Sequence, residues 1–332
     1  MSGEREDTLA RAERFVRARG NELSVERILP LVGDASTRSY FRLQRRGDRT
    51  SILALLPEPF EEKDSAFLSS AELFRAIPIR IPEIELVSGP EGALVLEDLG
   101  DRLLQHEFAE MDTGEKQRLY GEAVDILIRL QQRGRELEDP RYCAFRTRFD
   151  TAKFRWELDF FLKHFVGGLR GVALSPEETR DLSESFHELA TELASVSDAL
   201  CHRDYHSRNL MVTGNELAVI DFQDARIGPS SYDLVSLLHD SYVEHSDELV
   251  GRMRERFERG IGRGLSGEYE LAALQRNLKA LGTFGYQIAV RGNEVYRDYV
   301  EHTLKMVRGH LAESERWRGM RSILAAHLVE LQ

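Results

Sequence analysis

The spacing of apolar residues divides the chain into two parts with different patterns. A charged segment over residues 4–19 is typical of a surface helix, and short runs of β-forming residues separated by turn-like pieces follow it. These runs predict strands over residues 27–32, 39–44, 50–56, 83–88 and 93–97. A helix is expected between the third and fourth strands, over residues 64–76. The N-terminal part therefore predicts an antiparallel five-stranded sheet with one helix.

Beyond residue 100, apolar residues recur mainly at helical spacing. The expected helices cover residues 116–131, 150–165, 176–194, 232–242, 247–259, 269–290, 295–311 and 315–331. A β hairpin over residues 210–222 interrupts them, because Gly214-Asn215 is a favourable two-residue turn between two short β-forming runs. The sequence thus predicts an α+β protein of two lobes: a sheet lobe over residues 1–98 and a larger, mainly helical lobe over residues 99–332.

Composition and charge exclude several classes of protein. Of the 332 residues, 42% are hydrophobic and 31% are charged, which supports a folded core and argues against wholesale disorder. The 45 basic and 57 acidic residues give a net charge of -12, opposite in sign to that expected of a nucleic-acid-binding protein. No lysine follows a glycine, so the chain lacks a P-loop of the G-x-x-x-x-G-K-[ST] type.

The cysteine count, the N-terminus and the length of the apolar runs indicate the cellular compartment. Cys143 and Cys201 are too few for a disulfide framework or a cysteine-rich metal site. The N-terminus is charged and lacks the apolar core of a signal peptide, and no apolar run approaches the roughly 20 residues of a membrane span. We therefore expect a cytoplasmic protein without membrane association, and nothing in the sequence indicates an obligate protein partner.

The stretch with the most chemical information is residues 201–224, CHRDYHSRNLMVTGNELAVIDFQD. Asn209 follows Asp204 by five residues and precedes the predicted hairpin, whereas Asp221 comes directly after its second strand. The start of the first strand of a hairpin lies beside the end of the second, so the Asn209 and Asp221 side chains are expected to converge. Asp204 lies one short loop upstream, at the same end.

This arrangement suits phosphoryl transfer. The reaction needs a carboxylate that orients or deprotonates the attacking hydroxyl, and hard oxygen ligands for the Mg²⁺ that neutralises a triphosphate. The order H-R-D-x-x-x-x-N followed by D-F resembles the catalytic pattern of protein-kinase-like enzymes. The resemblance implies that Asp204 is the catalytic base and that Asn209 and Asp221 are the metal ligands. His202 and Arg203 would support the loop.

The protein-kinase-like resemblance also implies an ATP site between the lobes. The turn over residues 33–38 (GDASTR) would cover the phosphates, with Ser36 and Arg38 as candidate contacts. The end of the last strand, Glu97, Asp98 and Leu99, would form the hinge beside the adenine.

One feature of the kinase pattern is missing. Protein kinases carry a lysine on the third strand, and the matching strand here, residues 50–56, has none. Lys63, an arginine (Arg38 or Arg42) or the metal would have to supply that positive charge.

Further motifs narrow the resemblance. They are D-F-Q-D-A at residues 221–225, G-P at 228–229, Y-D-L at 232–234, Q-R-N-L-K-A-L-G at 275–282, and G-D-A-S with Y-F-R at 33–36 and 40–42. These are similar to the aminoglycoside phosphotransferase/choline kinase superfamily. Within it they resemble the bacterial cell-wall-recycling kinases that phosphorylate the anomeric hydroxyl of N-acetylmuramate and N-acetylglucosamine. The resemblance runs from about residue 25 to residue 310. It implies an ATP-dependent amino-sugar 1-kinase of peptidoglycan recycling, and these kinases also tend to lack the third-strand lysine.

The resemblance further implies where the sugar binds. Gln223, Asp224 and Arg226 follow the metal-binding aspartate and would face the sugar. Asp224 would accept hydrogen bonds from sugar hydroxyls, and an arginine such as Arg226 would pair with the lactyl carboxylate of N-acetylmuramate. His206 would border the pocket, and Asp233 would anchor the catalytic loop.

On the helix expected over residues 150–165, three charged side chains compete for a substrate contact. They are Arg155, Glu157 and Asp159. The resemblance favours Glu157.

Two other functions stay open. The first is phosphorylation of another small alcohol, such as an aminoglycoside or choline, for which a cationic acceptor would want a pocket rich in carboxylates and poor in arginine. The second is a non-catalytic, nucleotide-binding pseudokinase. The presence of Asp204, Asn209 and Asp221 together argues against the second, because a non-catalytic protein has no chemical need for all three.

Overall fold

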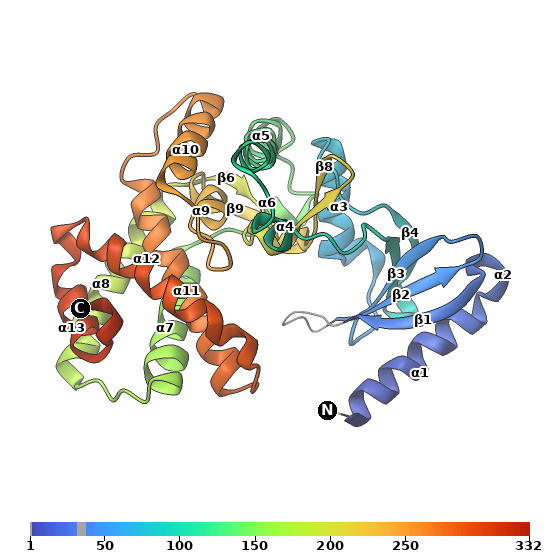
Figure 1. Cartoon of the computed structure of the whole chain (residues 1–332), viewed down its shortest axis with the longest axis horizontal. Coiled ribbons are helices and arrows are strands. Elements are labelled where there is room, and N and C mark those ends of the chain that lie inside the picture. The colour runs from blue at the N-terminus through green and yellow to red at the C-terminus, as the bar shows by residue number, and fades with distance from the viewer. Residues whose placement is uncertain (1, 32–37) are drawn as a thin grey trace.

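The N-terminal part is built on one antiparallel sheet (Figure 1). The structure is a computed structural model that describes residues 2–31 and 38–332. The sheet has five antiparallel strands, as predicted, and their order is β1-β2-β3-β5-β4. Its strands are β1 (Val25–Leu31), β2 (Ser39–Arg45), β3 (Thr50–Leu55), β4 (Ile84–Ser88) and β5 (Ala93–Glu97). The helical segments around it are α1 (Ser2–Ala18), α2 (Gly20–Leu23), η1 (Glu62–Asp64), α3 (Ala66–Ala76) and η2 (Gly89–Glu91).

The alternation of side chains along the strands decides what each face of the sheet contacts. Phe41 and Leu53 belong to a hydrophobic cluster with residues of α1. Ala54 and Leu94 belong to the main core, which includes residues of α3. Successive side chains of a strand point to opposite faces, so Arg42, next to Phe41, points away from α1. This face of the sheet looks toward the helices of the C-terminal part.

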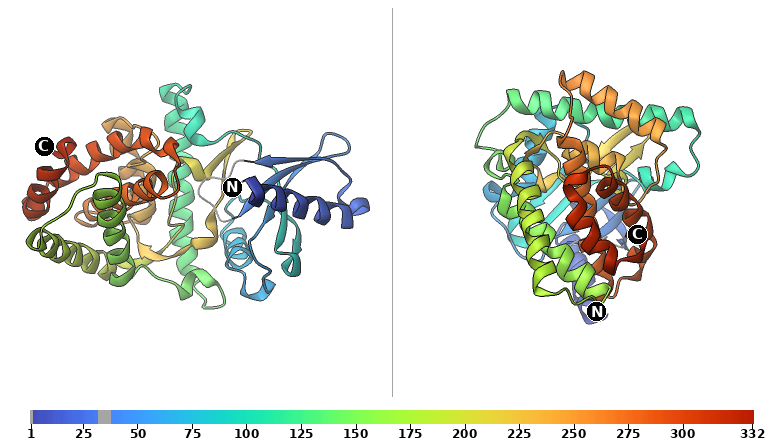
Figure 2. Two further views of the ribbon diagram at one scale, coloured as in Figure 1. Left: turned by 90° about the horizontal axis from the view of Figure 1, so that it is seen from below. Right: turned by 90° about the vertical axis from the view of Figure 1, so that its left-hand side faces the viewer.

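The C-terminal part is mainly helical, as predicted. In the left view of Figure 2, the sheet and α1 lie at one end of the molecule and most of the helices at the other. The helices are α4 (Leu104–Phe108), α5 (Thr113–Glu136), α6 (Cys143–Arg146), α7 (Thr151–Phe161), α8 (Pro176–Ser195), α9 (Tyr232–Leu238), α10 (Asp247–Ile261), α11 (Glu268–Ala289), α12 (Val300–Ala312) and α13 (Arg318–His327). Shorter helical segments are η3 (Leu162–Leu169), η4 (Ser207–Asn209), η5 (Phe222–Asp224), η6 (Glu294–Tyr299), η7 (Glu315–Trp317) and η8 (Val329–Leu331).

Three of the expected helices are interrupted. The helix expected over residues 150–165 is α7 up to Phe161 and then continues as the π-helical segment η3. The helix expected over residues 295–311 begins as the 3-10 segment η6, and the last one is divided into η7, α13 and η8. Helical periodicity alone does not distinguish these helix types, because their residue spacings differ only slightly.

Two short strand pairs lie within the helical part. β7 (Leu210–Thr213) and β8 (Glu216–Val219) form the predicted hairpin. β6 (Ser197–Cys201) and β9 (Arg226–Pro229) form a second antiparallel pair that the sequence analysis missed. These strands have only five and four residues, and β9 contains a glycine and a proline, so they give little alternating pattern to detect. The two pairs bring the loop between β6 and β7 beside the loop between β8 and β9.

Two glycines let α11 lie directly on α7 and η3, which Figure 1 shows side by side with it. A Cβ atom at Gly282 would lie 2.9 Å from the Phe161 backbone, and one at Gly285 would overlap the His164 carbonyl oxygen. Any side chain at either position would therefore force the backbones apart. The close contact fixes the position of α11, whose side chains are buried along almost its whole length.

Candidate active site

A cavity of about 1010 Å³ lies between the sheet and the helices. Residues of β2, β3 and the end of β5 form one side, and residues of α7, α11 and the two adjacent loops form the other. The predicted site residues that line it are Arg38, Arg42, Glu97, Asp98, Leu99, Glu157, Arg203, Asp204, His206, Asn209, Asp221, Gln223 and Asp224. Ser36, the remaining candidate of the phosphate-covering turn, lies outside the described residues.

The loop between β6 and β7 is held by a buried carboxylate. Asp233, at the start of α9, accepts hydrogen bonds from the backbone amides of His202 (2.5 Å) and Arg203 (2.9 Å). Burial raises the pKa of Asp233 to about 6, against the effect of His202 and these amides. Arg203 has a positive φ of 87°, a conformation that a non-glycine residue keeps only when its surroundings hold it. Asp233 and His202 thus lie behind the cavity wall, where they shape the loop.

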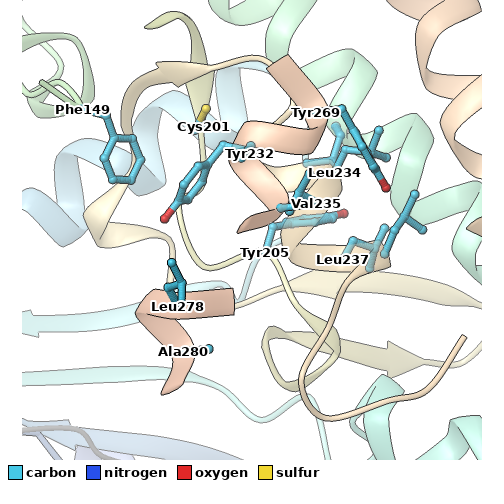
Figure 3. Close-up of a cluster of buried hydrophobic side chains, with 14 of the residues drawn as sticks. Phe149, Cys201, Tyr205, Tyr232, Leu234, Val235, Leu237, Tyr269, Leu278 and Ala280 are labelled. Carbon is cyan, nitrogen blue, oxygen red and sulfur yellow. The ribbon is translucent and has the colours of Figure 1, made fainter. Parts of the chain in front are cut away.

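Packing supports the loop from behind as well. Figure 3 shows Tyr205 and Tyr232 within a cluster of buried hydrophobic side chains that also includes Phe149 and Leu278 of α11. The Tyr205 hydroxyl donates to the Ala123 carbonyl of α5 at 3.0 Å. The loop is therefore tied to the helical core on both sides of Asp204.

Asp204 is surrounded by positive charge. Its Oδ1 lies 2.6 Å from Lys279 Nζ and 3.3 Å from Arg276 Nη2, and its Oδ2 lies 3.7 Å from Arg203 Nε. Burial by itself would raise the pKa of Asp204, but the neighbouring cations, Lys279 foremost, hold it well below its usual range. Asp204 is therefore ionised at any working pH.

Asn209 and Asp221 meet as the hairpin geometry predicts. The Ile220 amide donates to the Asn209 carbonyl at 3.0 Å, which joins the two loops. Asn209 Nδ2 donates to the Asp204 carbonyl at 2.8 Å, so the amide oxygen is left for another ligand. Asp221 has a left-handed φ of 63°, and one of its oxygens accepts from Gln223 Nε2 at 2.7 Å. Two hard oxygen donors thus lie on one cavity wall.

This donor set fits a magnesium ion bound together with phosphates. Mg²⁺ is commonly held by one or two protein oxygens, with phosphate and water oxygens completing the shell. The described residues contain no cluster of three or more His, Cys, Asp or Glu side chains that would form an all-protein metal site. An amide oxygen and a carboxylate, as at Asn209 and Asp221, fit a divalent cation that also binds phosphate oxygens.

On the sheet side, Arg42 is bound at the hinge. Its guanidinium pairs with Asp98 at 2.6 Å and with Asp101 at 2.8 Å, and these hydrogen bonds, that of Asp101 first, raise its pKa. Glu97 pairs with Arg80, which lowers the pKa of Glu97. The charged side chains at the hinge therefore all form ion pairs within the protein.

The place of the missing lysine is apolar. Ile52 of β3 lines the cavity and Ala54 is buried in the main core. Lys63 lies exposed on η1 and does not line the cavity. Arg38, just before β2, does line the cavity. Its guanidinium lies 5.5 Å from the centre of the Phe67 ring, and its Nη1 donates to Gln223 Oε1 at 3.2 Å.

The substrate candidates divide into two groups. Glu157 is buried on α7, faces the cavity and accepts a hydrogen bond from Gln275 of α11 at 2.9 Å. Arg155 and Asp159 pair with each other and do not line the cavity, and Arg155 also donates to the Ser183 carbonyl of α8. Arg226 is not among the cavity-lining residues: its Nε donates to the Asp224 carbonyl, and its guanidinium lies over Phe149.

Part of the cavity wall was not predicted from the sequence. We use the term helical wall for seven cavity-lining residues of α7 and α11: Trp156, Glu157, Phe160, Arg276, Lys279, Thr283 and Tyr286. Arg276 and Lys279 belong to the Q-R-N-L-K-A-L-G motif, which by itself assigns them no role. Their signal is a pair of like charges three residues apart in a largely buried helix, where unpaired charges are costly.

Comparison with known proteins assigns the chain to a family. Residues 27–273 match the model of the "Phosphotransferase enzyme family". This match covers most of the chain, and the chain therefore belongs to that family. The predicted enzyme class, a phosphotransferase acting on an alcohol group, is thereby confirmed.

The most informative curated relatives are amino-sugar kinases. The chain is 29% identical over 286 residues to the N-acetylmuramate/N-acetylglucosamine kinase of Neisseria meningitidis, which covers 83% of each chain. It is 30% identical over 282 residues to the enzyme of that name from Pseudomonas aeruginosa, which covers 82% of this chain and 80% of the relative. The resemblance inferred from the motifs is confirmed.

Solved structures share the fold. Aminoglycoside phosphotransferase APH(2'')-Ib bound to ADP superimposes with a TM-score of 0.59 at 16% identity, over 88% of this chain and 97% of that one. Amicoumacin kinase, solved in complex with AMP-PNP, Ca²⁺ and Ami, gives a TM-score of 0.56 at 15% identity, over 89% of this chain and 95% of that one. These similarities confirm the predicted protein-kinase-like fold. None of the described helices is both long enough and apolar enough to cross a membrane.

Proposed function

We propose that this protein transfers the γ-phosphoryl group of ATP to the anomeric hydroxyl of N-acetylmuramate, N-acetylglucosamine or both, in the cytoplasmic recycling of peptidoglycan. The observation that carries the proposal is the convergence of Asp204, Asn209 and Asp221 on one cavity between the sheet and the helices. The curated relatives, which are named for this activity, support the choice of acceptor. Residues 1–98 would form the nucleotide lobe and residues 99–332 the lobe with the acceptor site.

In this proposal, the nucleotide lies against the sheet side of the cavity. The adenine would lie beside the hinge at Glu97–Leu99, and the triphosphate would extend toward Arg38 and Asp221. Asn209 and Asp221 would hold Mg²⁺, which when bound neutralises charge on the phosphates. The protein's own contribution is a preformed pair of oxygen ligands and a cavity that keeps bulk water from the reacting groups.

Asp204 would accept a hydrogen bond from the C1 hydroxyl and direct its oxygen at the γ-phosphorus. Because its carboxylate is ionised and held in place, Asp204 would orient the hydroxyl before it accepts the proton. The bond from the sugar oxygen to phosphorus forms while the bond to the bridging oxygen of ADP breaks, and the hydroxyl proton passes to Asp204. The products are the sugar 1-phosphate and ADP.

The charge of the acceptor region favours a neutral or anionic sugar over a polyamine. Four cavity carboxylates lie near the helical wall, and each already has a partner: Glu157 with Gln275, Asp204 with Lys279, Asp224 with Arg203, and Asp240 with the Ser207 amide. An aminoglycoside would have to compete with these partners. The anionic lactyl group of N-acetylmuramate would instead meet a cavity lined by several cations.

Aromatic side chains support a sugar acceptor too. Trp156 is 55% exposed, and its ring lies 5.3 Å from that of Phe160, which in turn lies 5.6 Å from that of Tyr286. An exposed tryptophan at a cavity rim offers a flat apolar surface for the apolar face of a pyranose.

A direct assay tests the proposed function. The purified protein would be incubated with ATP, Mg²⁺ and, in separate reactions, N-acetylmuramate, N-acetylglucosamine, choline and an aminoglycoside, and the products followed by ³¹P NMR. We expect an anomeric sugar phosphate with one or both amino sugars. Phosphorylation of the aminoglycoside or choline in preference to both sugars would refute the acceptor assignment, and nucleotide binding without any turnover would indicate a pseudokinase.

Arg38 is the cation that we propose in place of the third-strand lysine. It reaches over Phe67 to Gln223, and Gln223 in turn contacts Asp221, so its guanidinium lies beside the expected phosphates. Replacing Arg38 by methionine should lower kcat/KM for ATP roughly 10- to 100-fold, the range expected for a lost charge-assisted hydrogen bond. Lys63→Met serves as the matched control, because Lys63 is exposed on η1. Equal kinetics of the two variants would contradict the assignment.

A further inference from the structure

The carboxylate of Asp204 is in contact with more positive charge than it can neutralise. Lys279 and Arg276 both reach Oδ1, and Arg203 lies beside Oδ2. Arg203 is shared with Asp224, at 2.7 Å, and lies 3.9 Å from Glu157. Lys279 and Arg276, in contrast, come from one helix and converge on the same oxygen atom. Two cations from neighbouring turns of one helix thus share a single carboxylate oxygen at the reacting end of the cavity.

The two cations are held differently. Arg276 Nε donates to the Ser236 hydroxyl at 2.9 Å, so the guanidinium is fixed between α9 and Asp204. For Lys279, the hydrogen bond identified is the one to Asp204, and the side chain, 14% exposed, lines the cavity. An ammonium group on a flexible stem can rotate to a second acceptor while its helix stays in place.

We propose that Lys279 is a catalytic residue whose ammonium group bridges Asp204 and the γ-phosphoryl group during transfer. This inference rests on the proposed function, because it takes Asp204 as the group that orients the acceptor hydroxyl. Lys279, on α11, would supply a positive charge at the γ-phosphoryl group, whereas Arg38 would supply one from the opposite side of the cavity.

The geometry favours the phosphoryl group over the lactyl carboxylate of N-acetylmuramate as the second partner of Lys279. An acceptor hydroxyl bound to Asp204 would place its oxygen within hydrogen-bond distance of that carboxylate, and the phosphorus about 3–3.5 Å beyond. Lys279 Nζ, at 2.6 Å from Asp204, is then within reach of a γ-phosphoryl oxygen. The lactyl carboxylate of N-acetylmuramate is attached at C3, two ring carbons from the reacting C1 hydroxyl, and would lie away from this point.

The bridge also links charge stabilisation with proton transfer. As the bond to the bridging oxygen of ADP breaks, negative charge spreads over the phosphoryl oxygens and draws the ammonium group toward them. Asp204 then loses its nearest cation and becomes a better proton acceptor at the moment when the sugar hydroxyl releases its proton. Lys279 remains protonated throughout, so one proton moves, from the sugar hydroxyl to Asp204.

The test compares Lys279→Met and Lys279→Arg with Lys305→Met, a control in which an exposed lysine that pairs with Glu244 is changed in the same way. We would measure kcat and KM with N-acetylmuramate and with N-acetylglucosamine, together with ADP affinity and the thermal unfolding of each variant. Lys279→Met should lower kcat roughly 10²- to 10³-fold with both sugars, change the acceptor KM only a few-fold, and leave ADP binding intact. A loss confined to N-acetylmuramate would show that Lys279 binds the acceptor carboxylate instead, and an unchanged kcat would also overturn the proposal.

A pH profile gives a second readout, which a purely structural lysine would not change. Burial, and then Arg276, lower the pKa of Lys279 to about 8. The ammonium form is therefore lost as the pH rises through about 8, and the wild-type kcat should fall there. Lys279→Arg, which stays charged, should lack this alkaline decline even if its kcat is low. The charged or titratable groups that face Lys279 are Arg276, Arg203, Asp204, His206 and Glu157. An identical alkaline decline in both proteins would count against the proposal.

Failure of the proposed function would be seen separately. If the wild type phosphorylated neither sugar, the acceptor assignment would fall, and the slow transfer of the γ-phosphoryl group to water would become the assay for Lys279. A Lys279→Met protein that hydrolysed ATP at the wild-type rate would then refute the bridge.

Discussion

Replacing Asp204 by asparagine is expected to reduce kcat by roughly 10²- to 10⁴-fold, the range seen when a positioned proton acceptor is removed. Asparagine keeps the shape of the side chain but cannot take the hydroxyl proton. It also leaves Lys279 and Arg276 without their shared anion, so a modest decrease in thermal stability should accompany the loss. Steady-state kinetics with the amino-sugar acceptor would measure the effect.

Asp159→Asn is the matched control for this substitution. Asp159 is an exposed carboxylate on α7 that pairs with Arg155 and does not line the cavity. Its replacement should leave kcat within a factor of about two, because exposed ion pairs contribute little. If Asp204→Asn kept near-normal turnover while ADP still bound, Asp204 would not be the proton acceptor.

Replacing Asp221 by asparagine should have an effect of similar size through a different step. The substitution removes the only carboxylate of the proposed Asn209–Asp221 metal pair, and we expect kcat/KM for Mg–ATP to fall by roughly 10³-fold or more, because little charge neutralisation remains at the phosphates. The informative measurement is calorimetric: ADP binding with and without Mg²⁺. Wild-type affinity should rise with the metal, whereas that of Asp221→Asn should not.

Asp224→Asn separates this effect from a general loss of negative charge. Asp224 lies three residues away on the same cavity but is paired with Arg203. Its replacement should preserve the metal dependence of ADP binding. Wild-type metal dependence in Asp221→Asn would remove Asp221 from the metal site.

The parts of the site that the sequence predicts are those fixed by local chain geometry. A two-residue turn and two short strands determine that Asn209 and Asp221 meet, and the structure joins them through the Ile220 amide. Asp204 precedes Asn209 by five residues, and so short a loop keeps the two residues close together. These relations depend only on residues 204–221, so a motif within one stretch of chain is sufficient to predict that the three side chains lie together.

The parts that it does not predict depend on contacts between distant segments. Lys279 reaches Asp204 only because α11 packs against the loop from across the fold. Arg226 is close to Asp221 in sequence, but its side chain turns back to the Asp224 carbonyl, a contact that the motif does not indicate. The ion pairs of Arg42 with Asp98 and Asp101 are another such contact, because nothing in the strand pattern indicates them.

The direct contact of α11 with α7 at Gly282 and Gly285 has a consequence for altering acceptor preference. Glu157 on one helix and Lys279 on the other belong to a single rigid unit, bridged by Gln275. A mutation that reshapes the acceptor site by moving either helix would displace the reacting end of the cavity as well. We therefore expect a new specificity obtained in this way to come with a lower kcat. Trp156 and Tyr286, at the outer part of the same wall, are where selection or design can change the substrate while leaving the rate intact.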